Sequence, residues 1–321
     1  VGDLHLLSTV EEGKSIFLLC HLDTVFPPDH PFKEVWVDGD KLHGPGTGDM
    51  KAGVATVVYS VLAMAEAGVL DRIPLTVVLG PDEEIGAVHS RPVYEEERKN
   101  ALACLVVEGA GVNGEIVVSR NGKIGARVDC GGRNQHVGAV DLQKASALLE
   151  LAHKTIALEG LNGALPGVRV NVGKASGGLG PATIPAKAHA LIDVRWEDQK
   201  FRDELVQRIE EVVGMDDLAG CSSELTIMNE RSAWPLTPGT QRLADLIKGV
   251  SVGLGHPIEQ EHRLGTSDSN FFGCAGVPTI DGLGPICKGY HSAEEFVYIS
   301  SIAERTALLA NGLMAVAQEF A

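Results

Sequence analysis

Short apolar runs alternate with an amphipathic segment in the first third of the chain. Residues 15–20, 75–79 and 102–107 are apolar stretches with the length of buried strands, and residues 51–67 carry apolar positions at helical spacing. Strands that alternate with helices in this way predict an α/β domain with a parallel sheet covered by helices.

A different pattern follows in the middle of the chain. Residues 124–130, 167–172 and 188–196 have the composition of half-buried strands, and residues 141–158 and 199–213 have that of helices. Strands and helices in this order predict a separate α+β domain.

Long helical segments return near the C-terminus, at residues 240–253 and 299–319, with a short apolar strand at 277–280 between them. A chain of 321 residues also exceeds the usual size of one domain. We therefore expect the middle domain to be an insertion into the first. The expected boundaries are 1–123 and 234–321 for the first domain and 124–233 for the inserted one.

Charge and cysteine usage narrow the function classes. The 43 acidic residues against 27 Lys and Arg give a formal net charge of −16, which disfavours nucleic acids and anionic membranes as partners. The six cysteines form no CxxC pair, and no apolar run approaches the roughly 20 residues that span a bilayer. We expect a soluble, cytoplasmic protein with buried, reduced thiols. Because the chain starts at Val1 and reaches a core strand within fifteen residues, we also expect that an N-terminal portion precedes it.

Polar side chains follow the apolar strands. His21 and Asp23 come at the end of the first strand, and Glu108 follows the third. The carboxyl ends of strands in an open α/β sheet are where ligands bind, so these groups are expected at one edge of the sheet. Taken alone, the His-x-Asp pair is typical of a local hydrogen bond.

Three adjacent acids, Asp82, Glu83 and Glu84, follow the second strand. As an isolated feature they are typical of a surface loop, but at the edge of a sheet their mutual repulsion requires a cation or a proton. Two further candidates precede helices: Asp49, which could also serve as an N-cap, and His291.

The glycine-rich stretch 44–53 around Asp49 invites comparison with phosphate-binding loops. Such loops need Gly-Lys-Ser/Thr, whereas Lys51 is followed by Ala52, so this comparison fails. A mixed set of imidazoles and carboxylates instead suits zinc or a similar divalent ion. The candidate ligands are His21, Asp49, Glu84, Glu108 and His291.

Five ordered motifs resemble the zinc aminoacylase and carboxypeptidase family, which includes glutamate carboxypeptidase, acetylornithine deacetylase, succinyl-diaminopimelate desuccinylase and peptidase T. The resemblance covers nearly the whole chain, and the Val-Phe-Pro that ends the first motif is most similar to the glutamate carboxypeptidase branch. The motifs are HLDTVFP (21–27), GPGTGDMKAG (44–53), DEEIG (82–86), EG (108–109) and GYHS (289–292).

The resemblance implies a catalytic domain with a mixed sheet covered by helices, an inserted α+β dimerisation domain, and two zinc ions per chain, or cobalt or manganese in their place. The implied ligands are His21 and Glu108 on one metal, Glu84 and His291 on the other, and Asp49 bridging both. Asp23 would orient a ligating histidine, and Glu83 would be the general base for a metal-activated water that attacks an amide.

In the inserted domain, the resemblance implies that His136, in a Gly-Arg-x-x-His-x-Gly pattern, reaches an active site across a homodimer. Taken alone, His136 is typical of a loop histidine that caps the next helix. Arg195 and Asn171 would contact substrate, with Arg195 binding its carboxylate. Ala182 stands where family members have Asn, so one substrate contact is absent or replaced.

Gly265 and Thr266 belong to a glycine-rich turn that would also contact substrate. The reaction implied by the resemblance is release of a C-terminal amino acid, such as glutamate, from a peptidyl or N-acyl substrate. Two alternatives stay open. One is a small-molecule N-acyl amino acid deacylase that uses the same groups, and the other is an inactive binding homologue, against which the intact Glu83 and ligand set argue.

Overall fold

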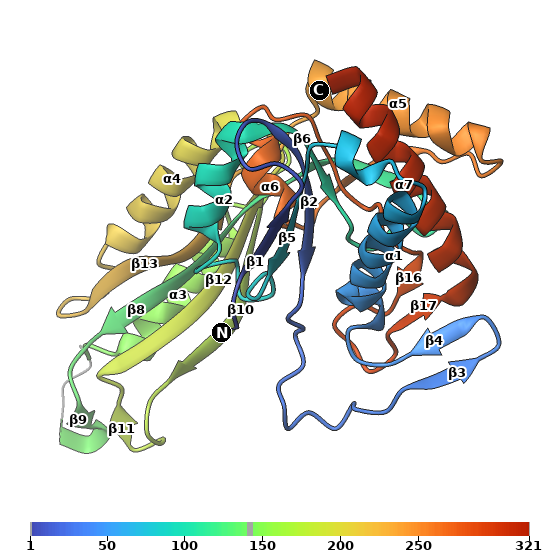
Figure 1. Cartoon of the computed structure of the whole chain (residues 1–321). Helices are drawn as coiled ribbons and strands as arrows, with labels where there is room; N and C mark the ends of the chain where they lie inside the picture. The colour runs from blue at the N-terminus through green and yellow to red at the C-terminus, as the bar shows by residue number, and fades with distance from the viewer. Residues whose placement is uncertain (1, 140–143, 321) are drawn as a thin grey trace. The chain divides into compact units, whose positions relative to one another are not determined.

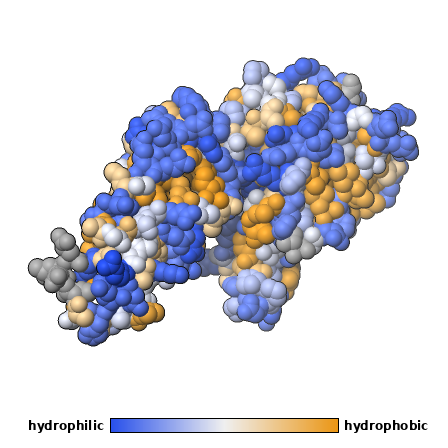
Figure 2. Space-filling view, turned by 90° about the vertical axis from the view of Figure 1, so that its left-hand side faces the viewer, coloured by the Kyte–Doolittle hydropathy of each residue, from blue (hydrophilic) through white to orange (hydrophobic). Residues whose placement is uncertain are grey.

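The computed structural model describes residues 2–139 and 144–320, and the chain divides into two compact units. Unit 1 comprises Val1–Arg120 and Trp234–Ala321, and unit 2 comprises Asn121–Ala233. None of the helices in the described ranges is both long and apolar enough to cross a bilayer. On the face seen in Figure 2, hydrophilic residues surround smaller hydrophobic patches.

Unit 1 is built on a mixed five-stranded sheet (Figure 1). Its central strands pair in parallel, as the alternation of strands and helices predicts, and β1 adds an antiparallel edge. In spatial order the strands are β1 (His5–Ser8), β5 (Leu75–Gly80), β2 (Ser15–His21), β6 (Ala101–Val106) and β15 (Thr279–Ile280).

Helices cover both faces of this sheet. Leu18 of β2 belongs to a buried cluster with Leu308, whereas the neighbouring Phe17 points the other way, with its ring centroid 5.3 Å from that of Phe272. Full burial of each such side chain stabilises the fold by about 1.5–3 kcal/mol. The first face packs against α1 (Ala52–Glu66), α5 (Pro238–Gly253) and α7 (Ile299–Phe320), and the second against α2 (Arg91–Glu97) and α6 (Ser269–Gly273).

Shorter strands flank the main sheet of unit 1. One small sheet has the order β16-β17-β4-β3, and in another β7 pairs in parallel with β14. These strands are β3 (Trp36–Asp38), β4 (Lys41–His43), β7 (Ile116–Arg120), β14 (Gln260–Arg263), β16 (Cys287–Lys288) and β17 (Phe296–Tyr298).

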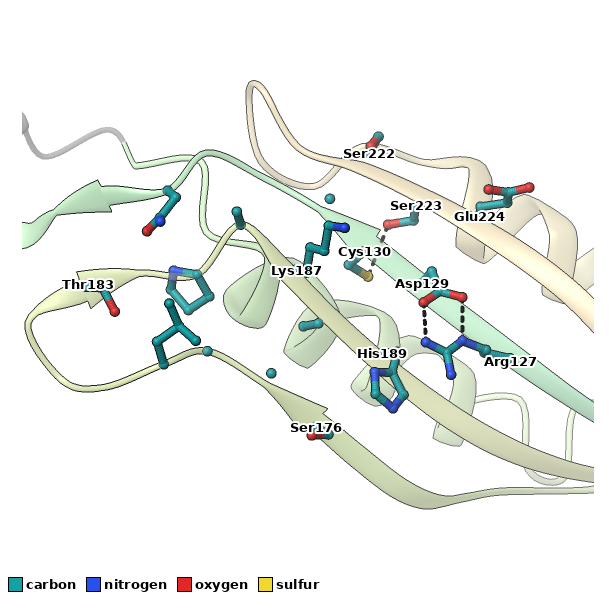
Figure 3. Close-up of a pocket in the computed structure, with 18 residues that line it drawn as sticks. Arg127, Asp129, Cys130, Ser176, Thr183, Lys187, His189, Ser222, Ser223 and Glu224 are labelled. Carbon is teal, nitrogen blue, oxygen red and sulfur yellow. Dashed lines mark hydrogen bonds and ion pairs between the residues drawn. The ribbon is translucent and has the colours of Figure 1, made fainter.

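Unit 2 is a four-stranded antiparallel sheet with two helices on one face. Val128 points toward the helices, whereas Arg127 and Asp129 lie on the opposite, open face, where Nε and Oδ2 are 2.6 Å apart (Figure 3). In spatial order the strands are β10 (Arg169–Gly177), β12 (Lys187–Trp196), β8 (Gly122–Gly131) and β13 (Ser222–Arg231). The helices are α3 (Ala147–Glu159) and α4 (Arg202–Gly214).

Two boundaries predicted in this unit are wrong. The helix predicted at 141–158 begins at Ala147, because Ser146 is extended and its Oγ accepts a hydrogen bond from the Leu149 N–H at 3.4 Å. The first three of those positions lie outside the described residues. The strand predicted at 167–172 begins at Arg169, because Gly167 turns the chain with a φ of 69°.

Candidate metal centre

His21 is the last residue of β2, and its side chain is only 1% exposed. Its Nε2 lies 3.0 Å from Oδ1 of Asp49 and 3.4 Å from Oε1 of Glu108, which follows the adjacent strand β6. Its Nδ1 lies 3.1 Å from the carbonyl oxygen of Asp23 and 3.3 Å from Oδ1 of the same residue. Both ring nitrogens are therefore surrounded by oxygen atoms.

Asp49 lies in a separate π-helical turn, Thr47–Lys51, immediately before α1. It is not the N-cap of that helix, a position that Lys51 occupies. Its two carboxylate oxygens face different histidines: Oδ1 contacts His21, and Oδ2 lies 3.2 Å from Nε2 of His291. The structure thus places one carboxylate between two imidazoles.

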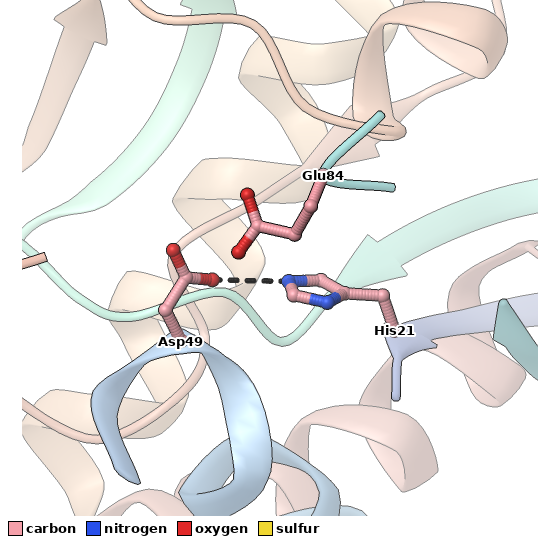
Figure 4. Close-up of side chains that lie close together, drawn as sticks. All are labelled: His21, Asp49 and Glu84. Atoms are coloured by element: carbon pink, nitrogen blue, oxygen red, sulfur yellow. Dashed lines mark hydrogen bonds and ion pairs between the residues drawn. The ribbon is translucent and has the colours of Figure 1, made fainter. Parts of the chain in front are cut away.

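Glu84 completes the group. Its Oε2 lies 3.4 Å from Nε2 of His291, and its Oε1 is buried and has no hydrogen-bond partner among the described residues. Ligand atoms of His21, Asp49 and Glu84 all lie within 4.8 Å of one another (Figure 4). These three residues come from three separate segments of unit 1, and a mixed set of imidazole and carboxylate donors suits a divalent cation.

Burial and mutual repulsion disfavour the charged forms of two acids. The pKa of Glu84 is raised to about 8 by burial and by the charges of Asp49 and Glu83. The pKa of Glu108 is raised to about 7 by burial and by Asp49. A divalent cation at this position would favour the charged carboxylates that these surroundings otherwise disfavour.

The two histidines are instead favoured in their charged, protonated forms. Burial favours the neutral ring of His21, but the charge of Glu108 and hydrogen bonds to Asp23 and Asp49 raise its pKa well above the usual value. A hydrogen bond to Asp49 raises the pKa of His291 to about 8. Without a metal ion, bound protons supply the positive charge that the acids require.

Asp23 has a second contact that the sequence did not indicate. Its Oδ1 accepts a hydrogen bond from the Glu83 N–H at 3.2 Å, and its Oδ2 accepts one from the Glu84 N–H at 3.0 Å. One carboxylate therefore orients His21 and also fixes the loop that carries both glutamates. Only the first of these roles was predicted from the sequence.

Four of the five candidate ligands, all except the buried His21, border a cavity of about 430 Å³, which we call the acidic cavity. Glu83 lines it next to the ligands, as do Gly265 and Thr266 of the predicted substrate-contacting turn. Two arginines, Arg120 and Arg263, belong to the same lining. The acidic cavity thus combines four candidate metal ligands, a candidate base and two cations.

Glu295 is a residue of this centre that the sequence analysis missed. It is fully buried, and its carboxylate accepts hydrogen bonds from the N–H groups of Gly46 (2.9 Å), Gly48 (2.8 Å) and Asp49 (2.9 Å). The available signal was an acid four positions after His291, at the start of an apolar strand. It links the loop of one candidate ligand to that of another.

The remaining predicted site residues belong to unit 2. His136 is exposed on the short strand β9 (Gln135–His136), and its Nδ1 accepts a hydrogen bond from the Gly138 N–H at 3.1 Å. Arg195 on β12 donates from Nε to Asp193 at 2.7 Å, and Asn171 on β10 is the register partner of that aspartate. Arg195 and Asn171 therefore lie on neighbouring strands of one sheet.

Comparison with known proteins supplies the family. Residues 17–315 match the model of peptidase family M20/M25/M40. The chain belongs to this family. It is 29% identical over 309 residues to carboxypeptidase G2 of Pseudomonas sp. (strain RS-16), a match that covers 94% of this chain and 74% of that protein. It is 27% identical to a succinyl-diaminopimelate desuccinylase of Alkalilimnicola ehrlichii, over 89% of this chain and 80% of the relative.

Solved structures of other proteins share the fold. A tripeptidase from Staphylococcus aureus superposes with a TM-score of 0.78 at 19% identity, covering 98% of this chain and 84% of the other. An M20 metallo-carboxypeptidase from Sulfolobus solfataricus gives 0.77 at 14% identity, covering 98% and 87%. Family membership and these relatives identify the protein as a metal-dependent hydrolase that acts on amide bonds.

Proposed function

We propose that this M20 hydrolase holds two zinc ions and releases a C-terminal amino acid, with glutamate as the leading candidate, from a peptidyl or N-acyl substrate. The observation that carries the proposal is the position of Asp49, whose Oδ1 faces His21 and whose Oδ2 faces His291. A carboxylate with one oxygen toward each of two imidazoles is suited to bridging two cations.

Each half of the site offers its own donor set. On one side His21 and Glu108 would hold a zinc ion together with Asp49, and on the other His291 and Glu84 would do so. The buried, unpartnered Oε1 of Glu84 fits this arrangement, because a buried carboxylate oxygen without a donor is costly unless a cation binds it. Nitrogen and oxygen donors of this kind suit zinc, cobalt and manganese.

Zinc bound at these residues would polarise the amide carbonyl and acidify water in the acidic cavity. Glu83 borders that cavity without being one of the five ligands. In the proposed reaction its carboxylate takes a proton from the attacking water and returns it to the departing nitrogen. Asp23 supports this step, because its Oδ1 holds the Glu83 backbone in place.

The lining of the acidic cavity supports a substrate with a carboxylate. Arg263 borders it with 22% of its side chain exposed and is held by Glu261 at 2.7 Å and by the carbonyl of Gly109 at 2.8 Å. A guanidinium fixed in this way is prepared to bind an acidic group of the substrate. The amides of Gly265 and Thr266 are a second proposed contact on the same wall.

Unit 2 supplies the remaining proposed contacts. We assign Arg195 and Asn171 to substrate binding, and His136 to the tetrahedral intermediate of a partner subunit in a homodimer. Unit 2 would thus be both the dimerisation domain and part of the substrate site. Similarity to desuccinylases favours a second candidate function, the removal of a small acyl group from an N-acyl amino acid by the same machinery.

Hydrolysis of a substrate panel by zinc-loaded protein tests the proposal. The panel contains N-acyl glutamates, N-acyl leucines, dipeptides and N-succinyl amino acids. The wild type is compared with Glu83→Gln, and Glu96→Gln on the exposed face of α2 is the matched control. Elemental analysis of each protein accompanies the assay.

We expect about two zinc ions per chain in all three proteins and an activity loss of at least about 100-fold in Glu83→Gln alone. Preference for N-acyl glutamates supports the carboxypeptidase proposal, whereas preference for N-succinyl amino acids selects the deacylase. Full activity of Glu83→Gln contradicts the assigned base.

A further inference from the structure

A second cavity in unit 1 contains a buried cation with almost no partners. Arg305 of α7 is only 4% exposed, and its guanidinium donates one hydrogen bond, from Nη2 to the carbonyl oxygen of Gly114. Its Nη1 is buried and has no hydrogen-bond partner among the described residues. Burial lowers the pKa of Arg305 to about 10, so the group stays charged at neutral pH.

An unpaired buried charge of this kind is costly, since the guanidinium has lost water and gained one carbonyl oxygen in exchange. Glu304 and Glu115 act on Arg305 only through their longer-range charge. Glu304 instead lies 3.7 Å from Nδ1 of His256, with 43% of its side chain exposed. At least one N–H donor of Arg305 therefore has no acceptor among the described residues.

The space beside Arg305 is large enough for such an anion. A cavity of about 290 Å³ lies between α5, α7 and the turn that follows α5, and Arg305 lines it. None of its lining residues borders the acidic cavity. Ser251 of α5 is already engaged: its Oγ donates to the carbonyl of Lys248 at 2.8 Å and accepts from the Ile258 N–H at 3.2 Å.

The walls of this cavity indicate the class of ligand. The apolar part of the lining consists of Leu254, Pro257, Ile258, Ile286, Ala307 and Leu308. Besides Arg305, the polar lining residues include Glu304 and His256. A single cation with acids nearby disfavours a doubly charged phosphate, whereas a planar carboxylate can accept two parallel N–H groups of an arginine. The apolar walls would bury a short hydrocarbon chain.

We propose that the Arg305 cavity is a binding site for a monocarboxylate with a short apolar chain, separate from the acidic cavity. Its carboxylate binds the free donors of Arg305, and its chain packs against Leu254 and Ile258. Neighbouring residues line the two cavities. Ile286 lines the Arg305 cavity and forms a parallel bridge with Ala110, and the next residue, Cys287, lines the acidic cavity.

Crystals of the wild-type protein soaked in 4-bromobutyrate locate the ligand, because bromine gives an anomalous signal. An anomalous peak in the Arg305 cavity is the expected result, whether or not a second peak occurs elsewhere. A peak confined to the acidic cavity, or none under conditions where butyrate binds in solution, overturns the proposal.

Calorimetric titration with butyrate measures the role of the guanidinium in solution. Arg305→Met keeps the length of the side chain and removes an unpaired charge, so the variant is expected to fold. We expect it to weaken butyrate binding about tenfold or more, whereas the control Arg242→Met, at an arginine whose side chain is 62% exposed, leaves binding unchanged.

Equal butyrate affinity in wild type and Arg305→Met contradicts the site. Inorganic phosphate is the competing probe for the ligand class. If phosphate displaces butyrate at equal concentration, the assignment to a monocarboxylate is wrong. If butyrate remains bound, the assignment is supported.

Discussion

The carboxylate of Glu295 accepts a hydrogen bond from the backbone N–H of Asp49 at 2.9 Å, although the two residues are 246 positions apart. Two further N–H groups of the same loop, those of Gly46 and Gly48, reach the same carboxylate. The loop of the proposed bridging ligand is therefore held by the segment that carries His291. This one buried acid thus links the Asp49 loop to the His291 segment.

Glu295→Gln tests this dependence. The amide N–H₂ group would face backbone N–H donors, so at least one hydrogen bond is lost, at a cost of about 1.5–3 kcal/mol. We expect a lower free energy of unfolding in urea and weaker zinc retention during dialysis. Glu294→Gln, at the exposed neighbouring position, is the control. Unchanged zinc retention in Glu295→Gln would show that the Asp49 loop keeps its conformation without the Glu295 carboxylate.

Asp23→Asn tests the two roles of Asp23, because it removes the negative charge and one of the two acceptor oxygens. The amide retains one acceptor oxygen, but it can no longer serve His21 and both the Glu83 and Glu84 N–H groups. Substitution of residues that orient metal ligands typically costs 10- to 100-fold in activity or metal affinity. We expect a loss in that range, measured as kcat/KM, and no change for the control Asp71→Asn on the exposed surface.

Zinc binding should release protons. In the metal-free protein at pH 7, Glu84 (pKa about 8) keeps its proton, Glu108 (pKa about 7) is half protonated and His291 (pKa about 8) is charged. Ligands bind metal in their deprotonated forms, so zinc affinity rises with pH through this range. Titration calorimetry in buffers of different ionisation enthalpy counts the released protons. A zinc affinity that stays constant from about pH 6 to about pH 9 contradicts these assignments.

The same pKa shifts make the stability of the metal-free protein depend on pH. The pKa values of Glu84, Glu108 and both histidines are all raised in the folded state, so each contribution is present at low pH and is lost as the pH rises through the folded value. We expect Tm of the metal-free protein to fall from about pH 6 to about pH 9. Zinc-loaded protein should not show this fall, because the metal replaces the protons.

Two glycines in helices provide a matched pair. A Cβ at Gly53 of α1 would collide with the carbonyl oxygen of Val107, whereas one at Gly249 of α5 meets no atom within 4 Å. We expect Gly53→Ala to destabilise by about 1–3 kcal/mol and to lower activity, since Val107 precedes Glu108. Gly249→Ala should stabilise by up to about 1 kcal/mol. Chemical denaturation measures the free energy of unfolding of both variants. Equal values would show that α1 can move away from the Val107 carbonyl group.

The sequence predicted the central strands of unit 1 because buried parallel strands are continuous apolar runs. Edge strand β13 escaped prediction, since it has no apolar run facing a core: Ile227 and Met228 are exposed, and its one buried position is Arg231. The candidate ligands could be found because each follows a strand or precedes a helix in a recognisable motif. The role of Glu295 and the second contact of Asp23 could not, because both depend on which loops the fold brings together.

Metal dependence is the central claim, and chelation followed by reconstitution tests it most directly. Hydrolysis of an N-acyl glutamate would be measured before chelation, after removal of metal to below about 0.1 ion per chain, and after return of zinc. We expect activity to disappear with the metal and to recover with about two zinc ions per chain. Full activity in the metal-depleted protein would contradict the account.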